Sequence, residues 1–311
     1  MMNIDKVTLC EVGLRDGFQN EQQIFSTEDK ITILDMLTDA GYPIIEVGSF
    51  MSPKAVPQMA DTDAVYKQAR LRDGVEYRAL IANLRGVQRA IDCGCKKVKL
   101  NVSASKAHNI ANLNMTPQES VAGFKACVDL AHDHHIEVSG SISMPFGSPW
   151  EDEIPLTDIE TIVQAYLNLD VKELSLSDAS GLAYPSQVKE IVTAMKAQFP
   201  EVKWILHFHN TRGLGIANIV AGMEAGVDTF DTSFAGLGGC PFVPGAAGNV
   251  SSEDVLNLMN QMHIDTGIDL DKVIEIGRFI RDRVQHDVHS YVLKAGKSVG
   301  LKLELPQKKV K

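Results

Sequence analysis

The sequence has few cysteines, no long hydrophobic run and no excess of positive charge. Its five cysteines among 311 residues are too few and too scattered for a disulfide scaffold, and an odd number is typical of a reducing compartment. No apolar run is long enough to cross a bilayer, and the first residues resemble neither a signal peptide nor an arginine-rich leader. We therefore expect a cytoplasmic protein without a membrane partner.

A basic surface is missing as well. The formal net charge is -10 at pH 7, which argues against nucleic acid as a general partner because nucleic acids bind basic faces. An anionic small molecule would need cations placed locally in its site. What the chain does have is hydrophobic residues, which make up 44% of it and can form one large core.

Short runs of strand type alternate with longer helical stretches along the whole chain. Four predicted helices begin at a serine or threonine that stands three residues before an acidic residue, at Ser26, Thr116, Thr157 and Ser251. The predicted strands are eight: 7–12, 44–50, 77–82, 97–103, 138–143, 173–179, 204–209 and 229–236.

Eight repeated strand and helix units predict an α/β fold of a particular kind. Such units form parallel sheets with right-handed crossovers, and eight of them favour a closed TIM (β/α)8 barrel over an open sheet. We expect a single domain over residues 1–311, with additional helices over about 266–311 that cover part of the barrel. Active sites in this fold lie where the strands end and the following loops begin.

Two histidines stand one residue apart at the end of the seventh predicted strand, in LHFHNTRG (206–213). In an extended segment alternate side chains share a face, so His207 and His209 point the same way. A lone buried histidine is usually a core residue bonded to backbone groups, but two on one face favour a ligand pair. Barrel closure places Asp16, which follows the first strand, near them, and two imidazoles with one carboxylate suit a divalent cation.

Further polar residues collect at the same ends of the predicted strands. Asn249, in the glycine-rich loop after the eighth strand, offers an amide oxygen, which favours octahedral Mg²⁺ or Mn²⁺ over tetrahedral zinc. Arg15 follows the first strand, Glu46 closes the second and Asp178 closes the sixth. Cys240 lies in the same loop as Asn249. We expect all of these side chains to meet in one site.

Two segments carry a resemblance to a known family. EVGLRDGFQNE (11–21) resembles the signature of the DRE-type metal-dependent TIM-barrel lyases and synthases, and AGLGGCPFVPGAAGN (235–249) resembles the active-site loop of the 3-hydroxy-3-methylglutaryl-CoA lyase family. The resemblance extends through 44–59, 175–181 and 207–213. It implies metal-dependent retro-Claisen cleavage of a 3-hydroxy-3-methylglutaryl thioester to acetyl-CoA and acetoacetate.

The resemblance also implies a role for each candidate residue. Asp16, His207, His209 and Asn249 match metal ligands, Arg15 and Cys240 match catalytic residues, and Glu46 and Asp178 match polar active-site groups. In the implied reaction the metal chelates the 3-hydroxyl and the distal carboxylate. Arg15 faces the thioester oxygen as it becomes an enolate, and Cys240 returns a proton to carbon. Asp178 or His207 accepts the hydroxyl proton.

The chain departs from the family pattern at four positions. Asn210 replaces the usual acid after the histidine pair, and Arg212 replaces a common aromatic residue. Met144 and Ser148 stand where many of these lyases have two cysteines. A related acyl-CoA with a longer substituent at C3 is therefore an alternative substrate.

Three other functions compete with the lyase interpretation. A condensing synthase of the same superfamily would make the bond instead, but such enzymes do not have the GGCP loop. A carboxyl-transferring barrel would need a modified lysine at a strand end, for which Lys99 is the candidate. A barrel that only binds acyl-CoA would have no need for the four metal ligands. We also expect the chain to form a homo-oligomer, a dimer.

Overall fold

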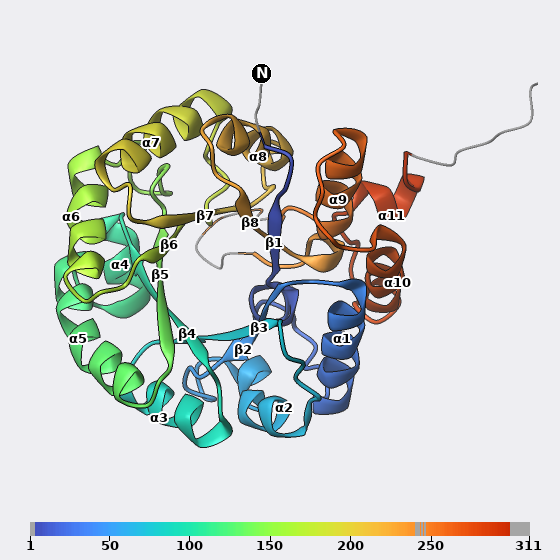
Figure 1. The fold of residues 1–311 in the computed structure, drawn as a ribbon, viewed down its shortest axis with the longest axis horizontal. Helices are drawn as coiled ribbons and strands as arrows, with labels where there is room; N and C mark the ends of the chain where they lie inside the picture. The colour runs from blue at the N-terminus through green and yellow to red at the C-terminus, as the bar shows by residue number, and fades with distance from the viewer. Residues whose placement is uncertain (1–3, 240–242, 244, 246, 299–311) are drawn as a thin grey trace, which may run out of the picture.

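Eight parallel strands form a closed barrel in the computed structural model, which describes residues 4–239, 243, 245 and 247–298 (Figure 1). Each strand pairs with the next along the chain, and the last pairs with the first. The TIM-barrel prediction is confirmed, and every predicted strand overlaps an observed one. The strands are β1 (Thr8–Glu11), β2 (Ile44–Ser49), β3 (Glu76–Ile81), β4 (Lys97–Ser103), β5 (Glu137–Ser143), β6 (Glu173–Asp178), β7 (Lys203–Phe208) and β8 (Thr229–Thr232).

Helices surround the barrel, as Figure 1 shows. Helix α10 packs against both α1 and α9, and α11 packs against α9. Both α10 and α11 lie in the segment for which the sequence predicts added helices. The helices are α1 (Thr27–Ala40), α2 (Thr62–Gln68), α3 (Leu84–Cys93), α4 (Lys106–Leu113), α5 (Pro117–Asp133), α6 (Leu156–Leu167), α7 (Pro185–Gln198), α8 (Gly215–Glu224), α9 (Ser252–Gln261), α10 (Leu270–Arg281) and α11 (Tyr291–Ala295).

Three of the four predicted helix caps are present. Ser26, Thr116 and Ser251 each accept the backbone N–H three residues on, at the starts of α1, α5 and α9. The cap at Thr157 is wrong, because α6 begins one residue earlier and has no side-chain cap. Pro155 precedes that first residue with φ at -56°, so the ring already fixes the dihedral angle that a helix start requires.

The two faces of the strands differ sharply in polarity. Residues that point outward, such as Ile45, Val98 and Phe230, are fully buried against the helices and form the hydrophobic core. Their neighbours along the strands point inward, since side chains alternate across a strand. Several of these inward residues are charged and at most 2% exposed: Glu46, Arg78, Lys99 and Asp231. A charged interior of this kind is stable only if its charges are paired.

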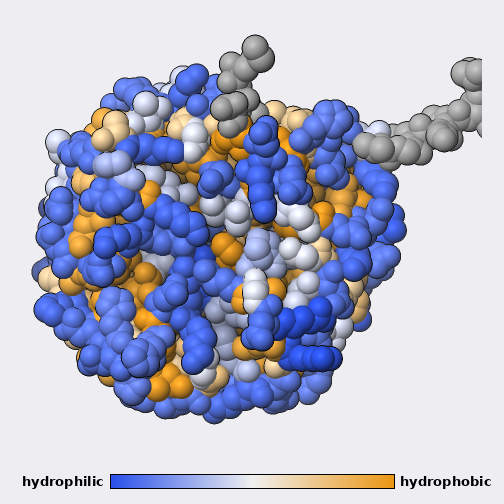
Figure 2. Space-filling view, viewed as in Figure 1, coloured by the Kyte–Doolittle hydropathy of each residue, from blue (hydrophilic) through white to orange (hydrophobic). Residues whose placement is uncertain are grey.

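The outer surface is mostly hydrophilic, with hydrophobic residues in small scattered areas, as Figure 2 shows for one face. Among the described residues, no helix combines the length and the apolar character needed to cross a membrane.

Candidate metal and active site

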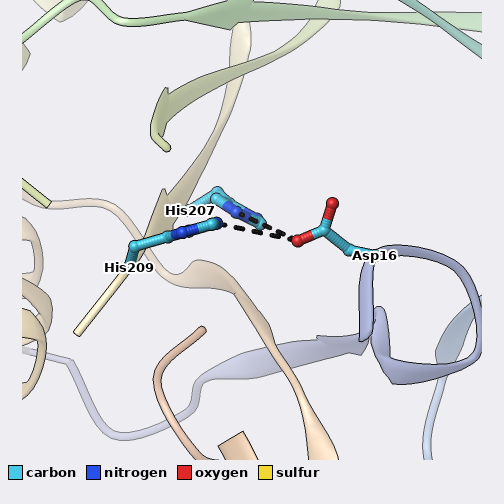
Figure 3. Close-up of side chains that lie close together, drawn as sticks. All are labelled: Asp16, His207 and His209. Atoms are coloured by element: carbon cyan, nitrogen blue, oxygen red, sulfur yellow. Dashed lines mark ion pairs between the residues drawn. The ribbon is translucent and has the colours of Figure 1, made fainter. Parts of the chain in front are cut away.

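Three potential ligands converge at the carboxyl end of the barrel (Figure 3). Asp16 comes from a π-helical turn, Gly13–Gly17, that directly follows β1. His207 lies in β7 and His209 immediately after it. Asp16 Oδ2 is 3.9 Å from His207 Nε2 and 3.6 Å from His209 Nε2, and one ligand atom from each residue lies within 4.8 Å of the others. The sequence therefore predicted this convergence correctly.

The charge states of these side chains suit a cation. Burial lowers the pKa of His209, which keeps its ring neutral, and a neutral ring is the form that binds metal. Burial alone would raise the pKa of Asp16, but the Arg15 guanidinium and the two imidazoles outweigh that effect and hold it well below its ordinary value. Asp16 is therefore a carboxylate across the neutral pH range.

Asn249 lies against this group, as the sequence predicted. A β-bridge joins it to His209, and its Nδ2 donates to Asp16 Oδ2 at 2.7 Å and to the Leu237 carbonyl at 2.9 Å. Its Oδ1 is buried and has no hydrogen-bond partner in the described part of the chain. A buried amide oxygen without a partner is costly unless something else binds it. The donor set of one carboxylate, two imidazoles and one amide oxygen fits Mg²⁺ or Mn²⁺.

Asp231 orients the first histidine, and the sequence reasoning missed it. Its Oδ2 lies 3.2 Å from His207 Nδ1, which leaves the Nε2 atom of that ring directed toward Asp16. A carboxylate behind a histidine ligand is a common support for a bound metal. The only signal in the sequence was a single acidic residue within a strand of otherwise uncharged residues, TFDTSF.

Arg15 is held by two carboxylates. Its Nη1 donates to Asp16 Oδ1 and its Nε donates to Glu46 Oε1. Glu46 lies in the middle of β2, at a register shift in its pairing with β3, and does not close the strand as predicted. Burial alone would raise the pKa of Glu46, but Arg15 and Lys99 outweigh it and keep the group ionised. An ionised Glu46 fixes the direction of the guanidinium.

Lys99 lies inside the barrel beside these groups. Its Nζ is 2.9 Å from Glu46 Oε2 and 3.3 Å from Asp231 Oδ2. Burial alone would lower the pKa of Lys99, but the two carboxylates outweigh it and raise the pKa above its ordinary value. A carboxylated lysine forms only from the neutral amine, so the structure gives no support to the carboxyl-transfer alternative.

Asp178 is next to the histidines in the sheet, because its backbone carbonyl accepts from the His209 N–H at 3.2 Å, but it does not line the cavity described below. It ends β6, and its carboxylate accepts hydrogen bonds from Ser180 Oγ and from the backbone N–H groups of Leu182 and Ala183. Burial raises its pKa to about 6. Arg212, one of the departures from the family pattern, donates to two carbonyls of the same loop. The carboxylate of Asp178 thus organises the loop after β6, as strand-end acids often do.

Cys240 lies outside the described residues. The residue before it, Gly239, is described. Its carbonyl accepts a hydrogen bond of 3.1 Å from Asn20 Nδ2, and Asn20 Nδ2 also donates to the Asp16 carbonyl. The start of the glycine-rich loop is therefore linked to the turn that carries Arg15 and Asp16.

A cavity of about 1260 Å³ opens above the ligand group and reaches outward over α3, α4 and α5. Arg15, Asp16, His207 and His209 line it together with Lys99 and Asp231, whereas Glu46 and Asp178 do not. This volume exceeds the usual 300–1,000 Å³ of small-molecule sites. It is large enough for a short acyl group and part of an extended chain attached to it.

Comparison with known proteins places the chain in a family. The family model described as HMGL-like matches residues 6–280. The chain is 40% identical over 280 residues, or 90% of its length and 93% of the relative, to a 3-hydroxy-3-isohexenylglutaryl-CoA/hydroxymethylglutaryl-CoA lyase of Pseudomonas aeruginosa. It is 37% identical to hydroxymethylglutaryl-CoA lyase YngG of Bacillus subtilis, over 94% of this chain and 98% of that protein.

A solved structure agrees with these sequence relatives. An HMG-CoA lyase from Acinetobacter baumannii, in complex with coenzyme A and 3-methylmalate, superposes with a TM-score of 0.92 at 39% identity, covering 97% of this chain and 98% of that one. Because the family model and the relatives match the chain along nearly its whole length, the protein belongs to the HMGL-like family.

Proposed function

We propose that the protein is a hydroxymethylglutaryl-CoA lyase that cleaves 3-hydroxy-3-methylglutaryl-CoA to acetyl-CoA and acetoacetate with a divalent metal. The observation that carries the proposal is the convergence of Asp16, His207 and His209 beside Arg15 in a cavity of about 1260 Å³. The names of the relatives support the same reaction.

The cleavage needs three events that balance without any other reactant. The 3-hydroxyl loses its proton, and C3 becomes a ketone as the C2–C3 electron pair moves to C2. The resulting acetyl thioester enolate then takes up a proton at C2. Asp16, His207, His209 and Asn249 would hold the divalent metal, which would supply Lewis acidity to make the hydroxyl more acidic. Arg15 offers a fixed positive charge where the enolate oxygen develops.

The two candidates for accepting the hydroxyl proton each meet an obstacle. His207 lines the cavity, but Asp231 occupies Nδ1 and a metal would occupy Nε2. Asp178 has a suitable pKa of about 6, but its oxygens accept hydrogen bonds from its own loop. The pH dependence of kcat in an Asp178→Asn variant separates them. If Asp178 is the base, both the limb near pH 6 and most of the turnover are lost; turnover near the parental level would exclude Asp178 as the base.

The direct test is product analysis with purified protein. After loading with Mg²⁺ or Mn²⁺, 3-hydroxy-3-methylglutaryl-CoA should yield equal amounts of acetyl-CoA and acetoacetate. Chelation should abolish turnover and either metal should restore it. Metal analysis of the protein as isolated identifies the physiological ion. Undiminished activity in a fully demetallated sample would contradict the metal assignment.

Cys240 is the proposed donor of the proton to C2. A thiol with a pKa near or moderately above the working pH can release a proton to an enolate carbon, whereas a serine hydroxyl is far less acidic. Cys240→Ser should therefore reduce turnover by roughly 10²–10⁴-fold and leave metal affinity unchanged. A variant with the parental rate would show that the thiol only packs.

A longer substituent at C3 is the second candidate for the substrate. The large cavity and the Pseudomonas aeruginosa relative, whose name includes 3-hydroxy-3-isohexenylglutaryl-CoA, favour it. Competition between the two thioesters measures the ratio of their kcat/KM values. We further propose a homodimer, which sedimentation analysis of the full chain tests.

A further inference from the structure

Lys99 has no part in the reaction as derived above, although it lines the cavity and is only 2% exposed. It comes from β4, whose neighbours in the barrel are β3 and β5. Its ammonium nevertheless contacts Glu46 on β2 and Asp231 on β8. The side chain therefore extends across the barrel interior, and it joins strands that do not pair with its own.

Each carboxylate that contacts Lys99 also contacts a residue of the candidate site. Glu46 accepts from Arg15 Nε through its other oxygen, and Asp231 Oδ2 lies 3.2 Å from His207 Nδ1. The result is a continuous buried series, Arg15–Glu46–Lys99–Asp231–His207, which we call the Lys99 chain. One end is the guanidinium that lines the cavity, and the other is a proposed metal ligand.

The two carboxylates depend on Lys99 to different degrees. Glu46 also has the Arg15 guanidinium, whereas among the described residues Asp231 has the lysine and the His207 ring as its close ion-pair partners. A buried carboxylate that loses its counter-charge is strongly unfavourable, so its position and its hydrogen bonds change. Loss of Lys99 should therefore disturb His207 most.

We propose that Lys99 is a positioning residue that acts on both halves of the site, on His207 through Asp231 and on Arg15 through Glu46. The inference deepens the proposed function and rests on it where turnover is concerned. Its effect on metal binding does not depend on any substrate.

Calorimetric titration of demetallated protein with Mn²⁺ tests the metal half. Lys99→Met keeps the side-chain length and removes the charge, and it should weaken Mn²⁺ binding by about 10–100-fold, the usual effect of changing a group that orients a ligand.

Lys97→Met is the matched control. Lys97 lies two residues earlier on β4, is 6% exposed and pairs with Glu76 and Glu173, which are not cavity residues. Its variant should bind Mn²⁺ within about twofold of the parent. Equal affinities of the Lys99→Met variant and the parent would overturn the proposal.

A double variant that removes one charge of each sign decides the matter even if Lys99→Met alone does not fold. Asp231→Asn removes the carboxylate through which Lys99 acts on the ring. Adding Lys99→Met to Asp231→Asn should then change Mn²⁺ affinity by less than about threefold, because residues that act through one another are not additive. A further tenfold loss in the double variant would show that Lys99 acts on the metal site by another route.

Turnover tests the other half. At saturating Mn²⁺, where weaker metal binding no longer limits turnover, Lys99→Met should lower kcat more than it raises KM, and this loss should be smaller in a Glu46→Gln background. Equal losses in the Glu46→Gln and parental backgrounds would exclude Glu46 as the link. A parent protein that does not cleave the thioester at all would overturn the proposed function, while the Mn²⁺ titrations would still decide the role of Lys99.

Discussion

The barrel interior holds two buried ionic clusters, one at each end. The carboxyl-end cluster consists of Asp16, His207 and His209 together with the Lys99 chain. The amino-end cluster consists of Arg78, Lys97, Glu76 and Glu173, in which Lys97 Nζ lies 2.9 Å from Glu76 and 3.0 Å from Glu173, and Arg78 contacts both acids. In both clusters, charged side chains inside the barrel are paired with side chains of opposite charge.

The two clusters differ in the arrangement of the polar atoms that are not taken up by ion pairs. At the amino end Arg78 Nη1 has no hydrogen-bond partner in the part of the chain that the structure describes, so an unpaired atom alone does not identify a binding site. At the carboxyl end three ligand atoms face one another, and Asn249, whose Oδ1 has no hydrogen-bond partner among the described residues, donates through Nδ2 to Asp16. Convergent acceptor atoms, and not buried charge as such, distinguish a site for a cation from a structural ion pair.

The largest expected effect comes from removing a ligand. His209→Ala deletes one of the three converging atoms, so Mn²⁺ affinity should fall by more than about 100-fold, beyond the range for residues that only orient a ligand. Calorimetric titration measures the affinity, and turnover at low micromolar metal should be undetectable. If Mn²⁺ affinity falls less than tenfold, His209 is not a ligand, and the carboxyl-end cluster would resemble the amino-end cluster in being a set of structural ion pairs.

Arg15→Lys should have the next largest effect. It keeps the charge but loses the planar fork that both Asp16 and Glu46 hold, so the donor directed at the enolate oxygen is misplaced. Turnover should fall by about 10²–10³-fold, the usual loss for one donor to an oxyanion. Mn²⁺ affinity should stay within about threefold. A higher KM with unchanged kcat would move Arg15 to a role in substrate binding.

The amino-end cluster should affect stability alone. Arg78→Met leaves Glu173 with less counter-charge, and breaking a buried pair on one side costs about 3–5 kcal/mol of the free energy of unfolding. Denaturant titration measures that cost. Among the described residues Arg78 pairs with Glu76 and Glu173 and not with a ligand, so kcat of the folded fraction should change less than twofold. A large loss of kcat would show that the two ends are coupled.

The effect that needs the finest measurement is a difference in how two largely buried acids respond to pH, because it is spread over several pH units. Burial raises the pKa of Glu253, below the glycine-rich loop, to about 7. Burial alone would also raise the pKa of Glu173, but Arg78 and Lys97 outweigh it and lower the pKa to about 2. Glu253 therefore stabilises the fold at pH below 4.5 and loses this effect as pH rises to 7, whereas Glu173 stabilises it above 4.5 and loses this effect as pH falls.

Each acid shifts by about 2.5 units, which corresponds to about 3 kcal/mol over its own pH range. Glu253→Gln should flatten the dependence of unfolding free energy on pH between 4.5 and 7. Glu173→Gln should flatten it below 4.5. Denaturant titrations at a series of pH values measure both slopes, and equal slopes in the parent and both variants would contradict the assignment.

Local sequence determined the strands, most caps and the ligand pair. Strands are recognisable because successive side chains, such as those of Ile45 and Glu46, point to opposite faces and differ in polarity. Residues two apart share a face, which is why His207 and His209 point the same way. The shift of the α6 start shows the limit of such signals, since the threonine at 157 matches a capping pattern but the helix begins at Leu156, directly after Pro155.

Tertiary structure decided which charges meet. Lys99, Glu46 and Asp231 lie on strands that do not pair with one another, and closure of the barrel alone brings them within hydrogen-bond distance. Closure also brings Asn249 against Asp16, 233 residues earlier in the chain, to which its Nδ2 donates at 2.7 Å. The physical reason is that hydrophobic alternation acts over a few residues, whereas buried charges find their partners across the whole interior, where the low dielectric makes each pairing decisive.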